Sequence, residues 1–168
     1  MRTKYFLKTI PIVTSFFLII LNNAIPPPSG YGFVIPSISI VCLIYWSLKK
    51  ISDFNVLDAA IIGLLSDFII GTPIGSSVLL FIFTRTFLLW VCSRIDKNNP
   101  LINSVIIFLS ISFYYSFSYI FIIFYFNKQP FIKNYLMGYI LTLFLYPLVS
   151  IILNWLMKLK FLQYYENK

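Results

Sequence analysis

Apolar runs of about 20 residues, the length that an α-helix needs to cross a bilayer, recur from one end of the chain to the other. Strands of a membrane barrel would instead alternate over segments of about ten residues. Of the 168 residues, 60% are hydrophobic and 11% are charged, whereas soluble domains carry about 25% charged residues. The sequence therefore predicts an all-α integral membrane protein that forms one polytopic domain over residues 1–168.

We expect six transmembrane helices, because turn-forming segments such as PPPSGYG (26–32) and NKQPFIKN (127–134) divide the apolar runs. The predicted spans cover residues 5–25, 33–48, 55–70, 74–93, 101–126 and 135–157. The loops between them are too short to hold a folded water-soluble domain. Contacts with other molecules therefore have to use helix surfaces, grooves between helices or short loops.

The basic residues predict the orientation of the chain in the membrane. With the N-terminus inside, ten of the 13 Lys and Arg residues fall on cytoplasmic segments, so the positive-inside rule places both termini in the cytoplasm. These ten residues are Arg2, Lys4, Lys8, Lys49, Lys50, Arg94, Lys97, Lys158, Lys160 and Lys168. The net charge of +8 thus indicates topology and attraction to anionic membrane lipid, with no nucleic-acid partner. A cleaved signal peptide is the less favoured interpretation of the N-terminus. A cleavage site after NNA (22–24) would need a small residue at the first of these three positions, where the chain has Asn.

Several chemistries are disfavoured by what the sequence lacks. It contains no His, which removes the usual general base and the usual metal ligand. Cys42 and Cys92 lie inside apolar runs without metal or redox spacing, so we expect them to be buried, inert thiols. There is also no phosphate-binding GxxxxGK[ST] loop. We therefore expect no catalytic residue, cofactor or metal, and no enzymatic activity.

The segment GLLSDFIIGTPIG (63–75) carries an unusual pattern of small and acidic residues. Gly63, Asp67 and Gly71 recur every four residues, which places them on one face of a helix. Small residues at this spacing let another helix approach closely in a membrane. That helix could belong to this chain or to a partner protein, and the sequence leaves both possibilities open.

The end of the same segment predicts a tight hairpin between the third and fourth spans. Thr72 is expected to be the N-cap of the fourth span, with Pro73 at its first helical position. Gly71 and Gly75 would supply the unusual backbone angles or the close approach that the turn needs.

Two acids and one arginine lie within the third and fourth spans, where unpaired charges cost about 3 kcal/mol or more. At 1.5 Å per residue, Asp67 lies about 8 Å from the hairpin turn, whereas Asp58 and Arg85 lie roughly 20 Å from it. We therefore predict that Asp58 pairs with Arg85. Asp67 is expected to face the first amides of the fourth span, around residues 75–77. Its role is either functional or the stabilisation of the hairpin.

Polar and small residues also form a strip along the sixth span. They occur every four residues and are Asn134, Gly138, Thr142, Tyr146, Ser150 and Asn154. Such a strip makes hydrogen bonds between helices or lines a cavity, and we favour helix packing. Ser112, Ser116 and Tyr119 form a weaker strip of the same kind on the fifth span.

Two stretches, IPSISIVCLIYWSLKK (35–50) and NVLDAAIIGLLSDFIIGTPIGSSVLL (55–80), resemble the rod shape-determining protein MreD family. The matching features are a proline early in the second span, an aromatic pair near its end and a GLL-x-D-x-x-x-G-x-P-x-G hairpin. The corresponding residues are Pro36, Tyr45, Trp46, Gly63, Leu64, Asp67, Gly71, Pro73 and Gly75. The chain departs from the family at KKISDF (49–54), where many members carry a proline.

The resemblance implies a non-enzymatic scaffold of the bacterial inner membrane that takes part in cell elongation. Its implied partners are the single-span periplasmic protein MreC and, indirectly, MreB filaments, the peptidoglycan polymerase RodA and its penicillin-binding transpeptidase. The family is also similar in fold to the substrate-binding subunits of energy-coupling-factor vitamin transporters. The alternative prediction is therefore such a transporter subunit, with Asp67 and the polar strips lining a ligand pocket.

Overall fold

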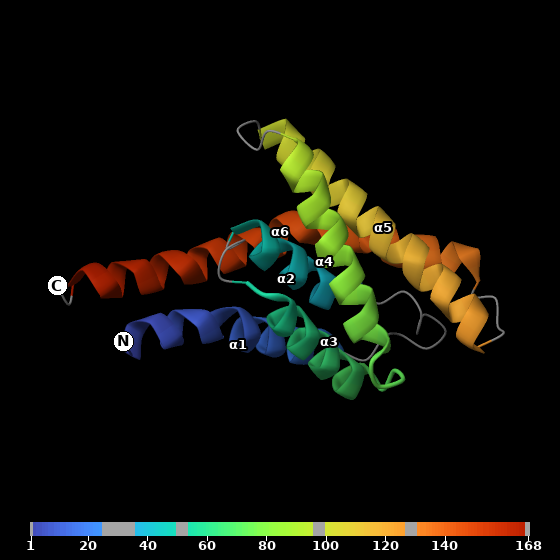
Figure 1. Cartoon of the computed structure of the whole chain (residues 1–168), viewed down its shortest axis with the longest axis horizontal. Helices are drawn as coiled ribbons and strands as arrows, with labels where there is room; N and C mark the ends of the chain where they lie inside the picture. Colours follow the sequence, from blue (N-terminus) through green and yellow to red (C-terminus); the bar gives the residue numbers. More distant parts are fainter. Residues whose placement is uncertain (1, 25–35, 50–53, 96–99, 127–130, 167–168) are drawn as a thin grey trace.

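The computed structural model describes residues 2–24, 36–49, 54–95, 100–126 and 131–166 (Figure 1). These residues form six α-helices, which confirms the all-α class. The helices are α1 (Arg2–Ala24), α2 (Ile38–Lys49), α3 (Val56–Ile70), α4 (Ser76–Arg94), α5 (Pro100–Phe126) and α6 (Ile132–Glu166). The loop predicted at 26–32, and parts of those at 94–100 and 127–134, lie outside the described residues.

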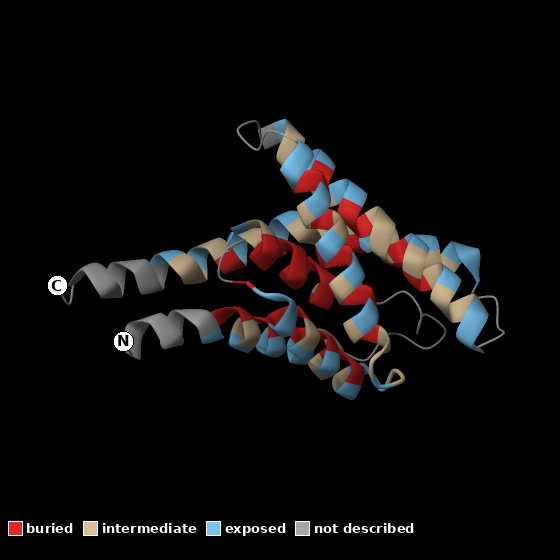
Figure 2. Cartoon of the chain, in the orientation of Figure 1, coloured by how far each residue is buried: buried red, intermediate tan, exposed pale blue. Residues whose placement is uncertain are grey.

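Helix α2 lies at the centre of the bundle (Figures 1 and 2). All of its residues from Ser39 to Ser47 are buried, and the other five helices pack against it. Its sequence, ISIVCLIYWSLK, has apolar residues on every side, as expected for a helix that is enclosed by other helices. Around it, α1 packs on α3, α3 on α4, α4 on α5 and α5 on α6.

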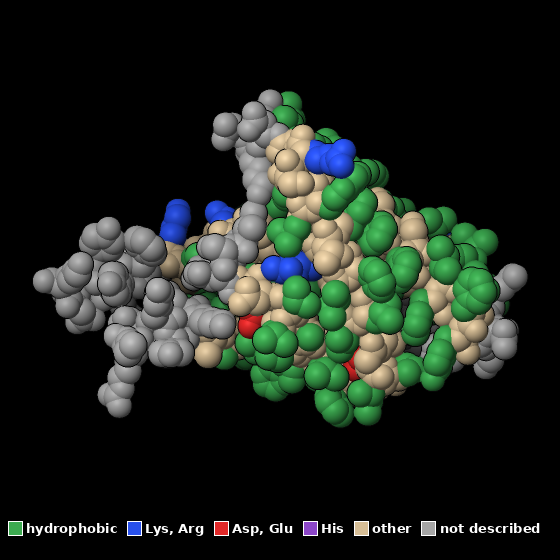
Figure 3. Space-filling view, viewed as in Figure 1, with side chains coloured by type: hydrophobic (Ala, Val, Ile, Leu, Met, Phe, Trp, Pro, Cys, Tyr) green, Lys and Arg blue, Asp and Glu red, His purple; other side chains and the backbone are tan. Residues whose placement is uncertain are grey.

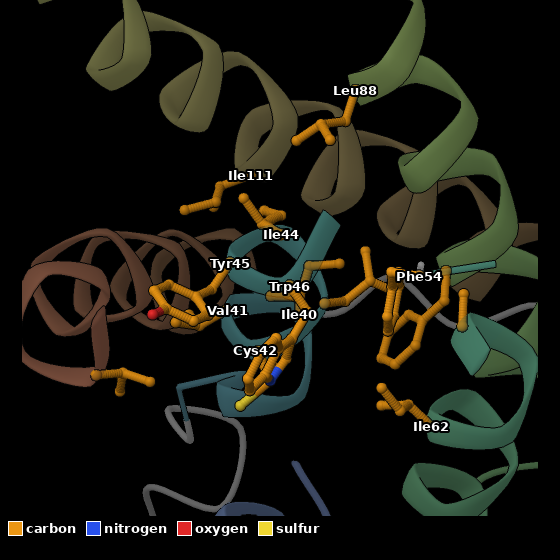
Figure 4. Packing of buried hydrophobic residues seen from close by; sticks show 14 of the residues in the cluster. Ile40, Val41, Cys42, Ile44, Tyr45, Trp46, Phe54, Ile62, Leu88 and Ile111 are labelled. Carbon is orange, nitrogen blue, oxygen red and sulfur yellow. The ribbon is translucent and has the colours of Figure 1, made fainter. Parts of the chain in front are cut away.

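The hydrophobic core surrounds α2 (Figure 4). Tyr45 and Trp46 are its largest fully buried side chains, and their rings meet edge to face at 5.3 Å between centroids. Phe54 contributes from the segment that precedes α3. Cys42 and Cys92 are buried free thiols, as the sequence predicted.

Among the described residues, three helical segments are long and apolar enough to cross a membrane, and the chain is therefore a multi-pass membrane protein. They are residues 76–94 of α4, Leu101–Tyr125 of α5 and Ile132–Lys158 of α6. Thr9–Ala24 and α2 are shorter apolar helices. At 1.5 Å per residue, α2 is about 18 Å long and α3 about 22 Å, against a hydrocarbon core of about 30 Å. The prediction of six membrane spans is thus supported by helix length for three of them.

Helix boundaries differ from the predicted spans at several points. The second helix begins at Ile38 instead of residue 33, because Pro36 and Ser37 are not helical. The fourth begins at Ser76 instead of residue 74. The first begins at Arg2, and the last continues to Glu166, past the predicted end at 157. Neither extension contains a Gly or Pro that would stop a helix.

The outer surface is largely apolar. Figure 3 shows hydrophobic side chains over α3, α4 and α5 on the face in view. Leu57, Phe68, Ile74, Phe124 and Phe144 are each at least two-thirds exposed, as expected for side chains that contact lipid. The start of α1 and the end of α6 lie at the same end of the molecule (Figure 1).

Candidate functional site

Asp67 joins the end of α3 to the start of α4, and its side chain is 1% exposed. The hydroxyl of Thr72 donates to its Oδ1 at 2.6 Å, and the backbone N–H of Gly75 donates to Oδ2 at 2.8 Å. The N–H of Ser77 and the hydroxyl of Ser76 donate to Oδ1 at 3.1 and 3.2 Å. The carboxyl group thus acts as an acceptor in every contact. These bonds confirm the predicted position of Asp67 at the first amides of the fourth helix.

The cap of α4 comes from the preceding helix, which corrects the prediction for Thr72. Gly75 occupies the N-cap position with φ +96° and makes no side-chain cap of its own. Pro73 lies before the helix, where its carbonyl accepts the N–H of Ser76 at 3.0 Å. Asp67 supplies the negative charge that the start of a helix favours. Thr72 therefore binds Asp67 instead of capping α4 itself.

The three glycines of the hairpin serve two different purposes. A Cβ atom on Gly63 would lie 2.7 Å from the Cα of Val78, so this glycine allows the backbones of α3 and α4 to touch. Gly71 and Gly75 have φ values of +78° and +96°, which few residues other than glycine adopt. Gly71 caps the end of α3, where its N–H donates to the carbonyl of Asp67 at 2.9 Å.

The two faces of α3 have different contacts. Gly63 and Asp67 are buried toward α4, so the structure assigns these two residues to packing within the chain. The opposite face is apolar and exposed, and Leu64 belongs to it with 38% of its surface accessible. The exposed residues of this face are Leu57, Ile61, Leu64 and Phe68.

Asp58 and Arg85 meet at the start of α3, but their hydrogen bonds differ from the predicted ion pair. Arg85 is close enough to Asp58 for electrostatic attraction. Its guanidinium donates to the carbonyl of Phe54 and lies 5.8 Å from the centre of the Phe54 ring. Asp58 accepts the N–H of Asn55 at 2.8 Å. The side chains of Asp58 and Arg85 therefore each form a hydrogen bond with a backbone group at residues 54–55. Such groups are costly to leave unpaired in a membrane.

The polar strip of α6 makes hydrogen bonds to other helices. Thr142 is buried and accepts the backbone N–H of Ser37 at 3.1 Å. The hydroxyls of Tyr115 and Thr142 are 2.6 Å apart, and that of Tyr115 also donates to the carbonyl of Gly138 at 3.1 Å. Ser112 and Tyr139 are joined by a hydroxyl pair at 2.8 Å. These contacts tie α6 to α5 and to the residue before α2.

The second half of the strip connects to the aromatic pair of α2. The hydroxyl of Tyr45 donates to the side-chain carbonyl of Asn154 at 2.8 Å. Tyr146 is half-buried. Ser150 differs from the others, because its hydroxyl donates to the carbonyl of Pro147 in its own helix. Ser116, predicted on the inner strip of α5, is exposed to the outside.

Some polar contacts are made by residues that the sequence patterns did not indicate. Ser118 is hydrogen-bonded to Tyr135, whose hydroxyl also donates to the carbonyl of Tyr115 at 2.7 Å. Asn22 donates its side-chain amide to the carbonyl of Pro36 at 3.1 Å. Ser118 and Tyr115 lie three residues apart on one side of α5, and this spacing was the available signal.

The fold and the hairpin define a multi-pass helical membrane protein whose intramembrane polar groups join helices to one another. Within the described ranges, no three His, Cys, Asp or Glu residues are grouped so that they could hold a metal.

The family model described as rod shape-determining protein MreD matches residues 4–165, and the chain belongs to this family. It is therefore a non-enzymatic membrane protein with a role in determining rod cell shape. Comparisons with the curated proteins and with the solved structures give no match.

Proposed function

We propose that this protein is a scaffold of the cell-elongation machinery in the bacterial inner membrane, with both termini in the cytoplasm. It binds an MreC-type single-span periplasmic protein. Through that protein it links MreB filaments to a RodA-type polymerase and a penicillin-binding transpeptidase. Membership of the MreD family supports the role in cell shape, and the linkage is the part that we propose.

The observation that carries this proposal is the construction of the α3–α4 hairpin. Asp67 and Gly63 both make their contacts between the two helices. The opposite face of α3 is left exposed and apolar. Helices associate in a membrane through close packing, since lipid removes the hydrophobic driving force between them. A partner helix therefore needs a surface of fixed shape, and the contacts of the hairpin fix the position of α3 relative to α4.

Co-purification with the MreC-type protein tests the proposal. We expect Gly63→Leu and Asp67→Asn to reduce the amount of partner recovered, because both changes disturb the hairpin. Phe144→Ala is the control, since Phe144 is 73% exposed on α6, away from the hairpin. Membrane levels of each variant are measured by immunoblot, so that loss of protein is separated from loss of binding.

Cell shape gives a second measurement of the same proposal. Depletion of the protein in a rod-shaped host should give rounded cells, and the wild-type chain should restore rods. Hairpin variants that reach normal membrane levels should fail to restore them. If such variants bound the partner normally and restored rods, the hairpin would have no part in assembly.

The transporter alternative requires the polar strips to line a ligand pocket. The hydroxyls of Thr142, Tyr115 and Tyr45 instead form hydrogen bonds with other groups of the protein. These contacts join helices, which favours the scaffold. Thermal-shift measurements on the purified protein with water-soluble vitamins separate the two functions. A large stabilisation by any one vitamin would support the transporter subunit and contradict our proposal.

A further inference from the structure

Each of the three tryptophans of the chain precedes a cationic residue by three or four positions. The pairs are Trp46 with Lys49, Trp90 with Arg94, and Trp155 with Lys158. Residues three or four apart are neighbours on a helix surface, so each indole lies one turn from a positive charge. Tryptophan and basic residues both gather where a transmembrane helix leaves the hydrocarbon core.

Two of these pairs are exposed, and they lie at the same side of the membrane. Trp90 is 55% exposed and Trp155 is 61% exposed, whereas Trp46 is 1% exposed within the core. Helices α4, α5 and α6 are all long enough to cross the bilayer. Because α5 crosses back between the other two, the C-terminal ends of α4 and α6 emerge on one side.

The pair on α4 has a geometry suited to an anion. The guanidinium of Arg94 lies 4.7 Å from the centre of the Trp90 ring, and both side chains are exposed. This contact uses the face of the indole, and the N–H donors of arginine are arranged as a fork that matches the oxygens of a phosphate. The end of the helix carries only about half a negative charge, which the full charge of Arg94 exceeds.

We propose that Trp90 and Arg94 form a binding site for the headgroup of an anionic phospholipid, with Trp155 and Lys158 as a second site of the same kind. In each site the cation binds the lipid phosphate, while the indole lies beside the glycerol region. The contact between Arg94 and the Trp90 ring makes α4 the stronger site. This proposal does not depend on the scaffold function or on its protein partners.

Fluorescence quenching by brominated lipids tests the site on α4. The full chain with Trp155→Phe is reconstituted in phosphatidylcholine vesicles, so that Trp90 is the exposed fluorophore and buried Trp46 gives a constant background. Brominated phosphatidylglycerol or brominated phosphatidylcholine is then added at matched mole fractions. We expect the anionic lipid to bind near Trp90 about fivefold more tightly, as one basic residue near the surface contributes about 1 kcal/mol.

Two further variants identify the source of the preference. Arg94→Gln should bring the ratio between the two lipids close to one. Lys133→Gln is the matched control, because Lys133 is exposed at the opposite end of α6 and its loss should leave the ratio unchanged. The reciprocal chain with Trp90→Phe reports on Trp155, where we expect a smaller preference that Lys158→Gln removes.

Equal quenching by both lipids in the Trp155→Phe chain would overturn the proposal. So would a preference that survives Arg94→Gln, or one that Lys133→Gln weakens equally, since the latter would indicate general surface charge. Inorganic phosphate at millimolar concentration is expected to leave the preference intact. If phosphate abolished it, the site would bind a soluble anion and the assignment to lipid would be wrong.

Discussion

Replacing Asp67 by asparagine removes one acceptor from the hairpin while keeping the size of the side chain. The carboxylate accepts the N–H of Gly75 with Oδ2. The N–H of Ser77 lies between the two oxygens, 3.1 Å from Oδ1 and 3.3 Å from Oδ2. In the asparagine variant, an NH₂ group takes the place of one oxygen and cannot accept a hydrogen bond. With the asparagine oxygen at the Oδ2 position, the buried N–H of Ser77 keeps only its longer contact of 3.3 Å, and the remaining bonds lose their charge assistance; each effect costs about 1–2 kcal/mol. We expect a total loss of about 2–4 kcal/mol.

Unfolding in mixed detergent micelles, followed by far-ultraviolet circular dichroism, measures this loss. Asp58→Asn is a suitable control, since Asp58 is also a buried acid but lies in the first turn of its own helix and accepts a single backbone N–H, from Asn55. We expect it to cost about 1 kcal/mol. Thr72→Val should cost about 1 kcal/mol alone and less in the Asp67→Asn background, because the two residues share a bond. If Asp67→Asn changed the unfolding free energy by no more than its Asp58 counterpart, the hairpin would not depend on this carboxylate.

Three other substitutions test further contacts by the same unfolding measurement. Gly63→Ala should cost about 1–3 kcal/mol, since its Cβ would lie 2.7 Å from the α4 backbone, whereas Leu64→Ala on the exposed face should cost no more than about 0.5 kcal/mol. Tyr45→Phe removes the 2.8 Å bond to Asn154 and should cost about 1 kcal/mol, with most of that loss absent when Asn154→Leu is already present. Arg85→Met leaves a backbone carbonyl unpaired and should cost about 1–3 kcal/mol. If one of these three variants stayed within about 0.5 kcal/mol of the wild-type free energy of unfolding, the contact that it removes would contribute little to stability.

The hairpin could be predicted from the sequence because its contacts are local. Helical rise alone places Asp67 near the start of the next helix, and the small residues around it restrict the turn. The identity of the cap could not be predicted in the same way. Thr72-Pro73 has the pattern of an N-cap, but Asp67 already occupies the first amides of α4, so Thr72 turns toward the carboxylate.

Contacts between distant segments were outside the reach of sequence patterns. The strip on α6 indicated that Asn154 faces inward, but nothing in its spacing pointed to Tyr45, which is 109 residues away. A strict four-residue interval also drifts around a helix, so Ser150 is left bonding to its own backbone. Ser116 lies on the outer side of α5 for a related reason. Its neighbour Tyr115 is the inward residue, and one residue changes the direction of a helical side chain by about 100°.

The short central helix explains why polar side chains of α1 and α6 bind the backbone just before α2. α2 covers only about 18 Å, so the segment just before it is non-helical and its backbone needs partners. Asn22 of α1 binds the carbonyl of Pro36, and Thr142 of α6 binds the N–H of Ser37. At the other end of α2, Tyr45 is held by α6 as well.

Side-chain hydrogen bonds therefore tie α1 and α6 to the ends of α2, while α3 and α4 are joined to each other through Asp67 and Gly63. The unit formed by α3 and α4 contacts α2 through apolar packing around Trp46 and Phe54. Apolar packing has weaker directional preferences than hydrogen bonds, so the position of the α3–α4 unit over α2 is set by the shapes of the packed side chains. A partner that binds the outer face of α3 would therefore act on the rest of the bundle through this packing.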